Sequence, residues 1–155
     1  MRKNKVDIIT LGCSKNLVDS EQLMRQFAVN GYKVEHDPHK INGEIVVVNT
    51  CGFIGDAQEE SIEMILELGQ AKKQGKIGKL FVMGCLSERF LHDLEQELPE
   101  VDRFYGKFNW KELISDLGKA YHQELAYDRI LTTPKHYAYL KIAEGCDKHC
   151  TYCII

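Results

Sequence analysis

The sequence has 155 residues, of which 44% are hydrophobic and 28% are charged, a composition that suits one globular domain and the beginning of a second. The formal net charge of −3 leaves no overall excess of positive charge for binding nucleic acid. No apolar run approaches the roughly 20 residues of a transmembrane helix, and the N-terminus leads into a strand-like segment rather than a signal peptide. We therefore expect a cytoplasmic protein without a membrane partner.

Short apolar runs alternate with helical patterns over residues 1–125. The pattern predicts strands at residues 6–11, 32–35, 45–48, 80–83 and 103–105. It predicts helices over 16–30 and about 56–74, a third that Ser87 caps and Pro99 closes, and a fourth that Asn109 and Glu112 open. The alternation is typical of an α/β fold with an open, mostly parallel sheet and helices on both faces. On the second helix, the residues expected to be buried are Ile62, Ile65, Leu66 and Leu68.

The last thirty residues break this alternation. Residues 126–135 are expected to form a linker after a first domain of residues 1–125. Tyr137–Ile142 is predicted to be a new strand that leads into a cysteine-rich loop. Residues 136–155 are therefore interpreted as the start of a second domain.

The chain contains six cysteines, which fall into two groups of three. Because the cytoplasm keeps thiols reduced, metal ligation or redox chemistry is expected rather than structural disulfides. Cys13, Cys51 and Cys85 each come just after a predicted strand. The carboxyl ends of parallel strands meet at one edge of a sheet, so these thiols are expected to lie close together there. Gly12, Gly52 and Gly84 are neighbours that permit tight turns or a bulky ligand.

Other interpretations of this first triad remain open. Free cysteine is often simply buried, so three separate core thiols are the structural alternative. Structural zinc is less favoured because it usually takes four ligands. Three thiolates suit an iron–sulfur cluster that keeps one iron free for chemistry.

The second triad is Cys146, Cys150 and Cys153, with C-x3-C-x2-C spacing. Three thiolates within eight residues can wrap one [4Fe–4S] cluster and leave its fourth iron open. This spacing resembles the signature of radical S-adenosylmethionine enzymes. That signature usually has an aromatic residue before the last cysteine, and Tyr152 has this position here. A zinc knuckle with His149 or a distant fourth ligand is the alternative.

The two triads in this order resemble the methylthiotransferase family of radical S-adenosylmethionine enzymes. Three segments carry the resemblance: Leu11–Glu21, Val48–Ile54 and Tyr139–Cys146. Within that family, the first segment is closer to members that modify a ribosomal protein than to tRNA-modifying members, which usually show Gly-Cys-Gln-Met-Asn there. That segment also holds Asn16, Asp19, Ser20 and Glu21, to which the sequence assigns no chemistry; helix capping is one interpretation of Asn16 and Asp19.

The resemblance implies a flavodoxin-like methylthiotransferase N-terminal domain, followed by the first strand and cluster loop of a radical S-adenosylmethionine barrel. It implies that Cys13, Cys51 and Cys85 hold an auxiliary [4Fe–4S] cluster. It further implies that Cys146, Cys150 and Cys153 hold a second [4Fe–4S] cluster that binds S-adenosylmethionine, with Tyr152 as a candidate contact to that cofactor.

The implied reaction begins when a deoxyadenosyl radical abstracts hydrogen from an unactivated carbon, to which a methylthio group is then delivered. The implied substrate is the β-carbon of an aspartate in protein twelve of the small ribosomal subunit, with an electron donor as a further partner. Family members continue into a barrel and a nucleic-acid-binding-like domain. Contact with nucleic acid is thus expected only through such domains, and the 155-residue chain alone is expected to be inactive.

Three other functions remain as alternatives. A tRNA adenosine methylthiotransferase would share both triads. A non-catalytic metal-binding module, with zinc for example, would use the same cysteines. A flavodoxin-like small-ligand binder is compatible with the sheet, although the sequence has no Gly-rich phosphate loop.

Overall fold

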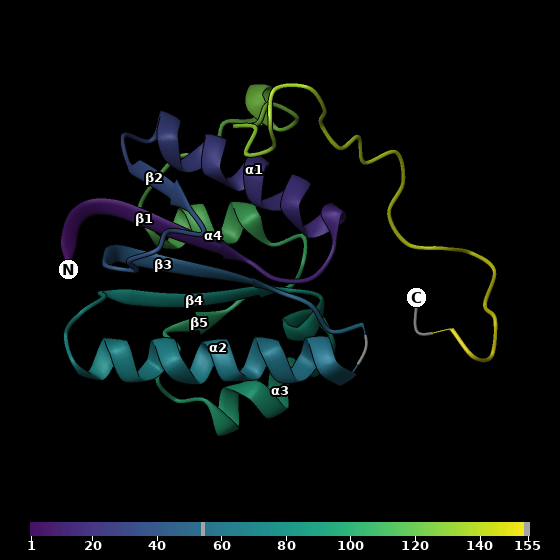
Figure 1. The fold of residues 1–155 in the computed structure, drawn as a ribbon, viewed down its shortest axis with the longest axis horizontal. Coiled ribbons are helices and arrows are strands. Elements are labelled where there is room, and N and C mark those ends of the chain that lie inside the picture. The colour runs from purple at the N-terminus through teal and green to yellow at the C-terminus, as the bar shows by residue number, and fades with distance from the viewer. Residues whose placement is uncertain (54, 154–155) are drawn as a thin grey trace.

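A single parallel sheet organises the chain, as the computed structural model of residues 1–53 and 55–153 shows. Within these residues the sheet has five strands in the order β2-β1-β3-β4-β5, and all neighbours are parallel. The strands are β1 (Arg2–Thr10), β2 (Lys33–His36), β3 (Gly43–Thr50), β4 (Lys79–Gly84) and β5 (Arg103–Phe104). This order is that of flavodoxin-like sheets, and it confirms the predicted fold class (Figure 1).

Helices cover both faces of the sheet, as predicted. In the described residues they are α1 (Ser14–Val29), α2 (Gly55–Lys73), α3 (Cys85–Glu97), α4 (Trp110–Asp116) and the short 3-10 helix η1 (Gln123–Leu125). Helices α1 and α4 pack on one face and α2 and α3 on the other (Figure 1). The β3 strand supplies both cores, because Val46 and Val48 point to one face and Ile45 and Val47 to the other. A strand covered on both sides is apolar throughout, which explains its β-branched run.

The buried face of α2 is narrower than predicted. Ile65 and Leu68 are buried, but Ile62 is 37% exposed and Leu66 49% exposed. The prediction was wrong for these two residues because each lies one position, about 100° around a helix, from the line that meets the sheet. The small residues Ser61 and Gly69 complete the buried line instead.

Two predicted helix starts need correction. Helix α3 begins at Cys85, so Ser87 lies inside its first turn. The Ser87 hydroxyl is buried and has no hydrogen-bond partner among the described residues. Asn109 does stand at the N-cap of α4, but its side-chain amide donates to the Glu112 carboxylate at 2.8 Å and not to the helix backbone.

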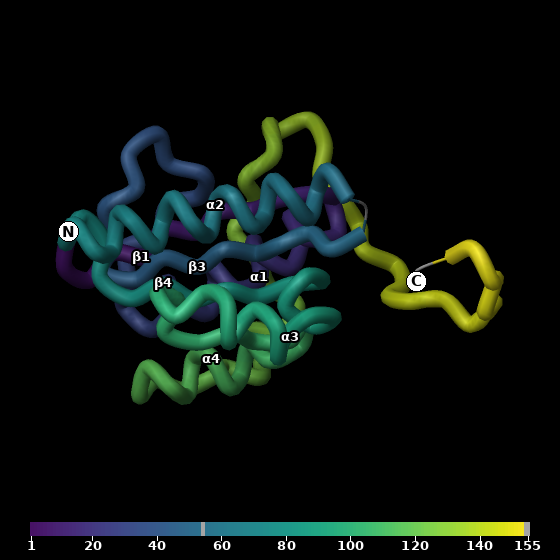
Figure 2. Tube along the Cα trace, turned by 90° about the horizontal axis from the view of Figure 1, so that it is seen from below, coloured from purple at the N-terminus to yellow at the C-terminus, as the bar shows by residue number. Residues whose placement is uncertain are grey.

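The predicted strand Tyr137–Ile142 is absent from the described residues, where this segment is irregular. A strand needs a neighbour that completes its hydrogen-bonded ladder, and the segment leaves the sheet instead of joining it. Figures 1 and 2 both show it extending outward beyond the end of the sheet where α1 begins. None of the helices in residues 1–53 and 55–153 is long and apolar enough to cross a membrane.

Candidate metal centre

The three cysteines of the first triad lie at the carboxyl ends of three adjacent strands. Cys13 is the N-cap of α1 after β1, Cys51 follows β3 directly, and Cys85 is the first residue of α3 after β4. They differ in access to solvent, since Cys13 is exposed, Cys85 is half-buried and Cys51 is buried. The fold thus brings three thiols that are far apart in sequence to one edge of the sheet.

Gly12 allows the first two of these cysteines to approach each other. Its φ of +88° is in the left-handed region, where side chains with a Cβ are strained. A Cβ at this position would lie 2.5 Å from Cys51 Cβ and 2.7 Å from Cys51 Sγ. Only glycine therefore leaves room for the Cys51 side chain against the turn that leads to Cys13.

Asn16 connects the three strand ends. Its side chain is fully buried, and its amide donates to the Leu11 carbonyl at 2.9 Å and to the Thr50 carbonyl at 3.0 Å. The Cys85 thiol lies 3.9 Å from Asn16 Oδ1. The helix-capping interpretation of Asn16 was wrong, because Cys13 has the N-cap position and Asn16 crosses to β3 instead.

The electrostatic surroundings of Cys85 combine opposing influences. Burial is the largest, and it raises the pKa of the Cys85 thiol. The positive charge of Lys107 lowers this pKa, whereas Cys51 and Cys13 raise it. Because Lys107 is itself 9% exposed, its charge is little screened by water. A cation fixed here favours the thiolate form in which cysteine binds metals.

The side chains of the described residues do not form a complete set of metal ligands. Residues 1–53 and 55–153 contain no group of three or more Cys, His, Asp or Glu side chains arranged to hold a metal ion. The three donors of the first triad nevertheless suit an iron–sulfur cluster in their chemistry, since thiolates are its usual ligands, and all three follow strands that end at one edge of the sheet. Cys13 is exposed at the rim, so rotation of its side chain meets little packing.

The second triad is not brought to this edge. Cys146, Cys150 and Cys153 are all exposed, and Tyr152 is 91% exposed. The loop contains a turn in which the Cys153 amide donates to the Cys150 carbonyl at 3.0 Å. Its roles in cluster and S-adenosylmethionine binding stay predictions.

Two acidic residues of the first motif bind the chain beyond residue 125, a role that the sequence did not suggest. Glu21 is buried in α1, and its carboxylate accepts hydrogen bonds from the Thr132 amide at 2.7 Å and the Thr132 hydroxyl at 2.9 Å. Arg129 lies 3.4 Å from the same carboxylate. Asp19, also buried, forms an ion pair with Lys141 at 2.5 Å. The signal in the sequence was an acidic residue within an apolar helical pattern, because a carboxylate that becomes buried needs a cation or hydrogen-bond donor as partner.

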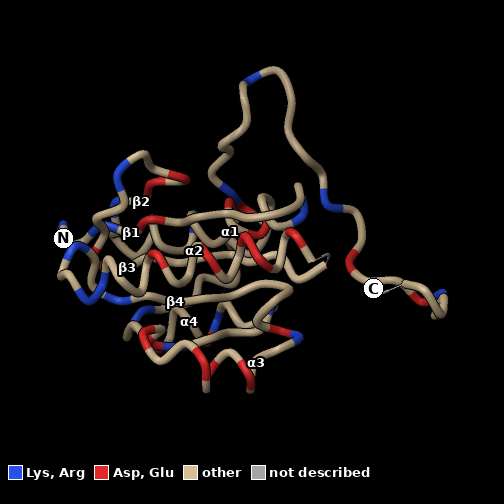
Figure 3. The backbone as a smooth tube through the Cα atoms, turned by 60° about the horizontal axis from the view of Figure 1, so that its bottom comes forward, with Lys and Arg blue, Asp and Glu red and all other residues tan. Residues whose placement is uncertain are grey.

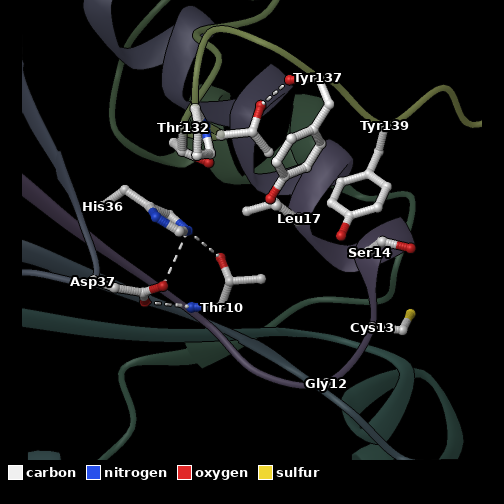
Figure 4. Close-up of a pocket in the computed structure, with 12 residues that line it drawn as sticks. Thr10, Gly12, Cys13, Ser14, Leu17, His36, Asp37, Thr132, Tyr137 and Tyr139 are labelled. Carbon is white, nitrogen blue, oxygen red and sulfur yellow. Dashed lines mark hydrogen bonds and ion pairs between the residues drawn. The ribbon is translucent and has the colours of Figure 1, made fainter.

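A polar pocket of about 390 Å³ lies beside Cys13. Its walls come from the ends of β1 and β2, the start of α1 and residues between 132 and 139. Figure 4 shows His36 and Asp37 on one side and the Tyr137 and Tyr139 rings on another, with Cys13 at the rim. The His36 ring bonds the Thr10 hydroxyl at 2.9 Å, which orders this wall of the pocket. Cys13 thus faces a space that residues 132–134 bound in part.

The sheet order and the cysteines at its edge are accompanied by clear similarity to known proteins. The chain belongs to the family described as uncharacterized protein family UPF0004, whose model matches residues 5–106.

Curated relatives match the whole chain. Proteins named ribosomal protein uS12 methylthiotransferase RimO are 86% identical over 155 residues in Parabacteroides distasonis and 70% identical in Phocaeicola vulgatus. The protein of that name in Flavobacterium johnsoniae is 53% identical over 156 residues. In each case the match covers 100% of this chain and 36% of the relative, so the chain spans about a third of their length.

Proposed function

We propose that the protein containing this chain is a radical S-adenosylmethionine methylthiotransferase that modifies ribosomal protein uS12 in the cytoplasm. The observation that carries the proposal is the arrangement of Cys13, Cys51 and Cys85 at adjacent strand ends. The names of the relatives, at up to 86% identity over the chain, support the substrate. The β-carbon of an aspartate is the proposed acceptor, and an electron donor is a required partner.

In this proposal each triad binds one [4Fe–4S] cluster. A cluster bound by three cysteines supplies an iron atom that remains open for a further ligand. Asn16 holds the strand ends, Gly12 leaves space for Cys51, and Lys107 offsets negative charge near Cys85. The exposed loop of Cys146, Cys150 and Cys153 is accessible to S-adenosylmethionine.

Anaerobic reconstitution of the 155-residue chain with iron and sulfide tests the metal centres. Two clusters correspond to about eight iron atoms per chain. The triple variant Cys13→Ser, Cys51→Ser, Cys85→Ser is expected to keep about four, and the matched triple variant at Cys146, Cys150 and Cys153 is expected to keep the other four. Stoichiometric zinc in a colourless protein, or full iron content in the first variant, would refute the proposal.

The substrate is tested with the whole protein that contains this chain. With uS12, S-adenosylmethionine and a reductant, mass spectrometry is expected to find one methylthio group on an aspartate of uS12. The same modification on tRNA adenosine, with unmodified uS12, would overturn the substrate assignment but leave the two clusters standing.

A further inference from the structure

A chain of alternating charges connects the C-terminal segment to the domain. It consists of Asp19 on α1, Lys141 and Glu144 on the segment, and Lys107 in the loop after β5, and we call these four residues the latch. Lys141 bonds Asp19 at 2.5 Å, and Lys107 bonds Glu144 at 2.6 Å. Lys141 and Glu144 also pair with each other. The segment carries charges of both signs as it leaves the domain, as Figure 3 shows.

Burial makes these contacts specific. The side chain of Asp19 is 2% exposed and that of Lys107 is 11% exposed, so each carries a charge that is largely removed from water. A buried charge without a partner is strongly unfavourable, whereas exposed ion pairs contribute little. Asp19 therefore favours a cation at position 141, and Lys107 favours an anion at position 144.

The latch sets the direction of the segment as well as its position. Asp19 and Lys107 belong to different parts of the fold, and they bind the segment at Lys141 and Glu144, which are three positions apart. Two separate anchors prevent the segment from rotating about either one. Beyond Gly145, residues 146–153 make no hydrogen bond or ion pair with residues 1–53 or 55–145. The latch is thus the last attachment before the second triad, which begins two residues after Glu144.

We propose that the latch positions the start of the Cys146–Cys153 loop relative to the sheet edge that carries Cys13, Cys51 and Cys85. Its four members act as positioning residues, because they hold the segment and not a reacting group. The purpose of such positioning, a set separation between two clusters, rests on the proposed function. The attachment itself does not, since every contact in it is made by the polypeptide alone.

Backbone ¹⁵N relaxation of the reduced, metal-free 155-residue chain tests the latch. Order parameters of residues 139–144 are expected to be near those of a rigid backbone, about 0.85, and those of 147–153 below about 0.6. Glu144→Gln and Lys141→Met are each expected to bring residues 139–144 below about 0.6, with unchanged values in β1, β3 and α1. Lys141→Arg keeps the charge and is expected to retain the order.

Asp147→Asn is the matched control, because it removes an equal charge three residues beyond Glu144 and outside the latch. The double variant Asp19→Asn, Lys141→Met removes both charges and leaves no buried carboxylate unpaired, so it separates loss of the latch from loss of the fold. Disorder of residues 139–144 in the parent chain, or order unchanged by Glu144→Gln and Lys141→Met, would overturn the proposal. Because the sample contains no iron, either result is independent of whether the triads bind clusters.

Discussion

Asn16 satisfies two backbone carbonyls at the ends of neighbouring strands with one buried amide. The backbone carbonyl of Asn16 accepts a hydrogen bond from the Asn49 side-chain amide at 2.9 Å, and the same Asn49 amide donates to the Ser20 hydroxyl at 3.0 Å. Ser20 in turn accepts from the Thr10 hydroxyl at 2.7 Å. These side chains form a polar network under the cysteines, and each member depends on the others because buried polar groups need partners.

Asn16→Ala is expected to destabilise the chain by about 2–4 kcal/mol, because two buried carbonyls lose their donor. Urea unfolding followed by circular dichroism measures the loss. Asn109→Ala is the matched control, since Asn109 is exposed and donates to an exposed carboxylate. Equal losses of unfolding free energy in the two variants would show that the Asn16 network adds no more stability than an exposed hydrogen bond.

At the scale of elements, the junctions between strands and helices carry the candidate site. Cys51 and Cys85 come directly after β3 and β4, and Cys13 lies three residues after β1 as the N-cap of α1. The strands β1, β3 and β4 are neighbours, so their junctions share one edge. The β5 strand and the loop after it add Lys107 from the far side of β4. Regular elements thus determine where the thiols lie, and short loops determine how closely they approach.

Gly12→Ala is expected to be more harmful than Gly31→Ala. Both glycines have a positive φ, +88° and +86°, so both substitutions carry a similar backbone cost of about 1–2 kcal/mol. Gly31 has nothing within 4 Å of an added Cβ in the described part of the chain, whereas Gly12 has Cys51 at 2.5 Å. The overlap adds about 1–3 kcal/mol. Thermal unfolding measures both variants, and a Gly31 loss as large as that of Gly12 would contradict the close contact.

At the scale of the whole molecule, hydrogen bonds attach residues 130–132, in the predicted linker, to helix α1. Glu21 binds the linker through its carboxylate, and its backbone carbonyl accepts from the Ile130 amide at 3.1 Å. Ile130 packs against the core on the α1 side of the sheet. The chain is therefore attached to α1 at residues 130–132, and beyond them the segment extends outward past the end of the sheet (Figure 2).

Arg129→Met is expected to loosen this linker, because it removes the cation beside the buried Glu21 carboxylate. If local opening becomes easier by about 1.4 kcal/mol, trypsin cleavage after the exposed Lys135 accelerates about tenfold. Gel electrophoresis or mass spectrometry follows the cleavage under conditions where the domain stays folded. Arg2→Met, at an exposed position on β1, is the control and is expected to leave the rate unchanged. An unchanged cleavage rate in Arg129→Met would show that Arg129 does not help to hold this stretch against α1.

The sequence by itself determined the strands of the parallel sheet, the helices that follow them and the placement of three cysteines after strands. These properties follow from local patterns: β-branched runs form the buried strands, helical periodicity separates them, and glycine marks the turns. The two misplaced residues of α2, Ile62 and Leu66, show the limit of this reasoning. Periodicity defines a helix face only to within one position, and the neighbouring sheet decides how wide that face is.

Only the tertiary structure decided which polar residues meet. Asn16 and Thr50 are 34 positions apart, and Asp19 and Lys141 are 122 apart, so no local pattern pairs them. The same holds for Tyr137–Ile142, whose sequence favours a strand but which joins no neighbour in the described residues. A strand, a buried ion pair and a network of amides each gain their stability from partners distant in sequence, and the fold alone brings those partners together.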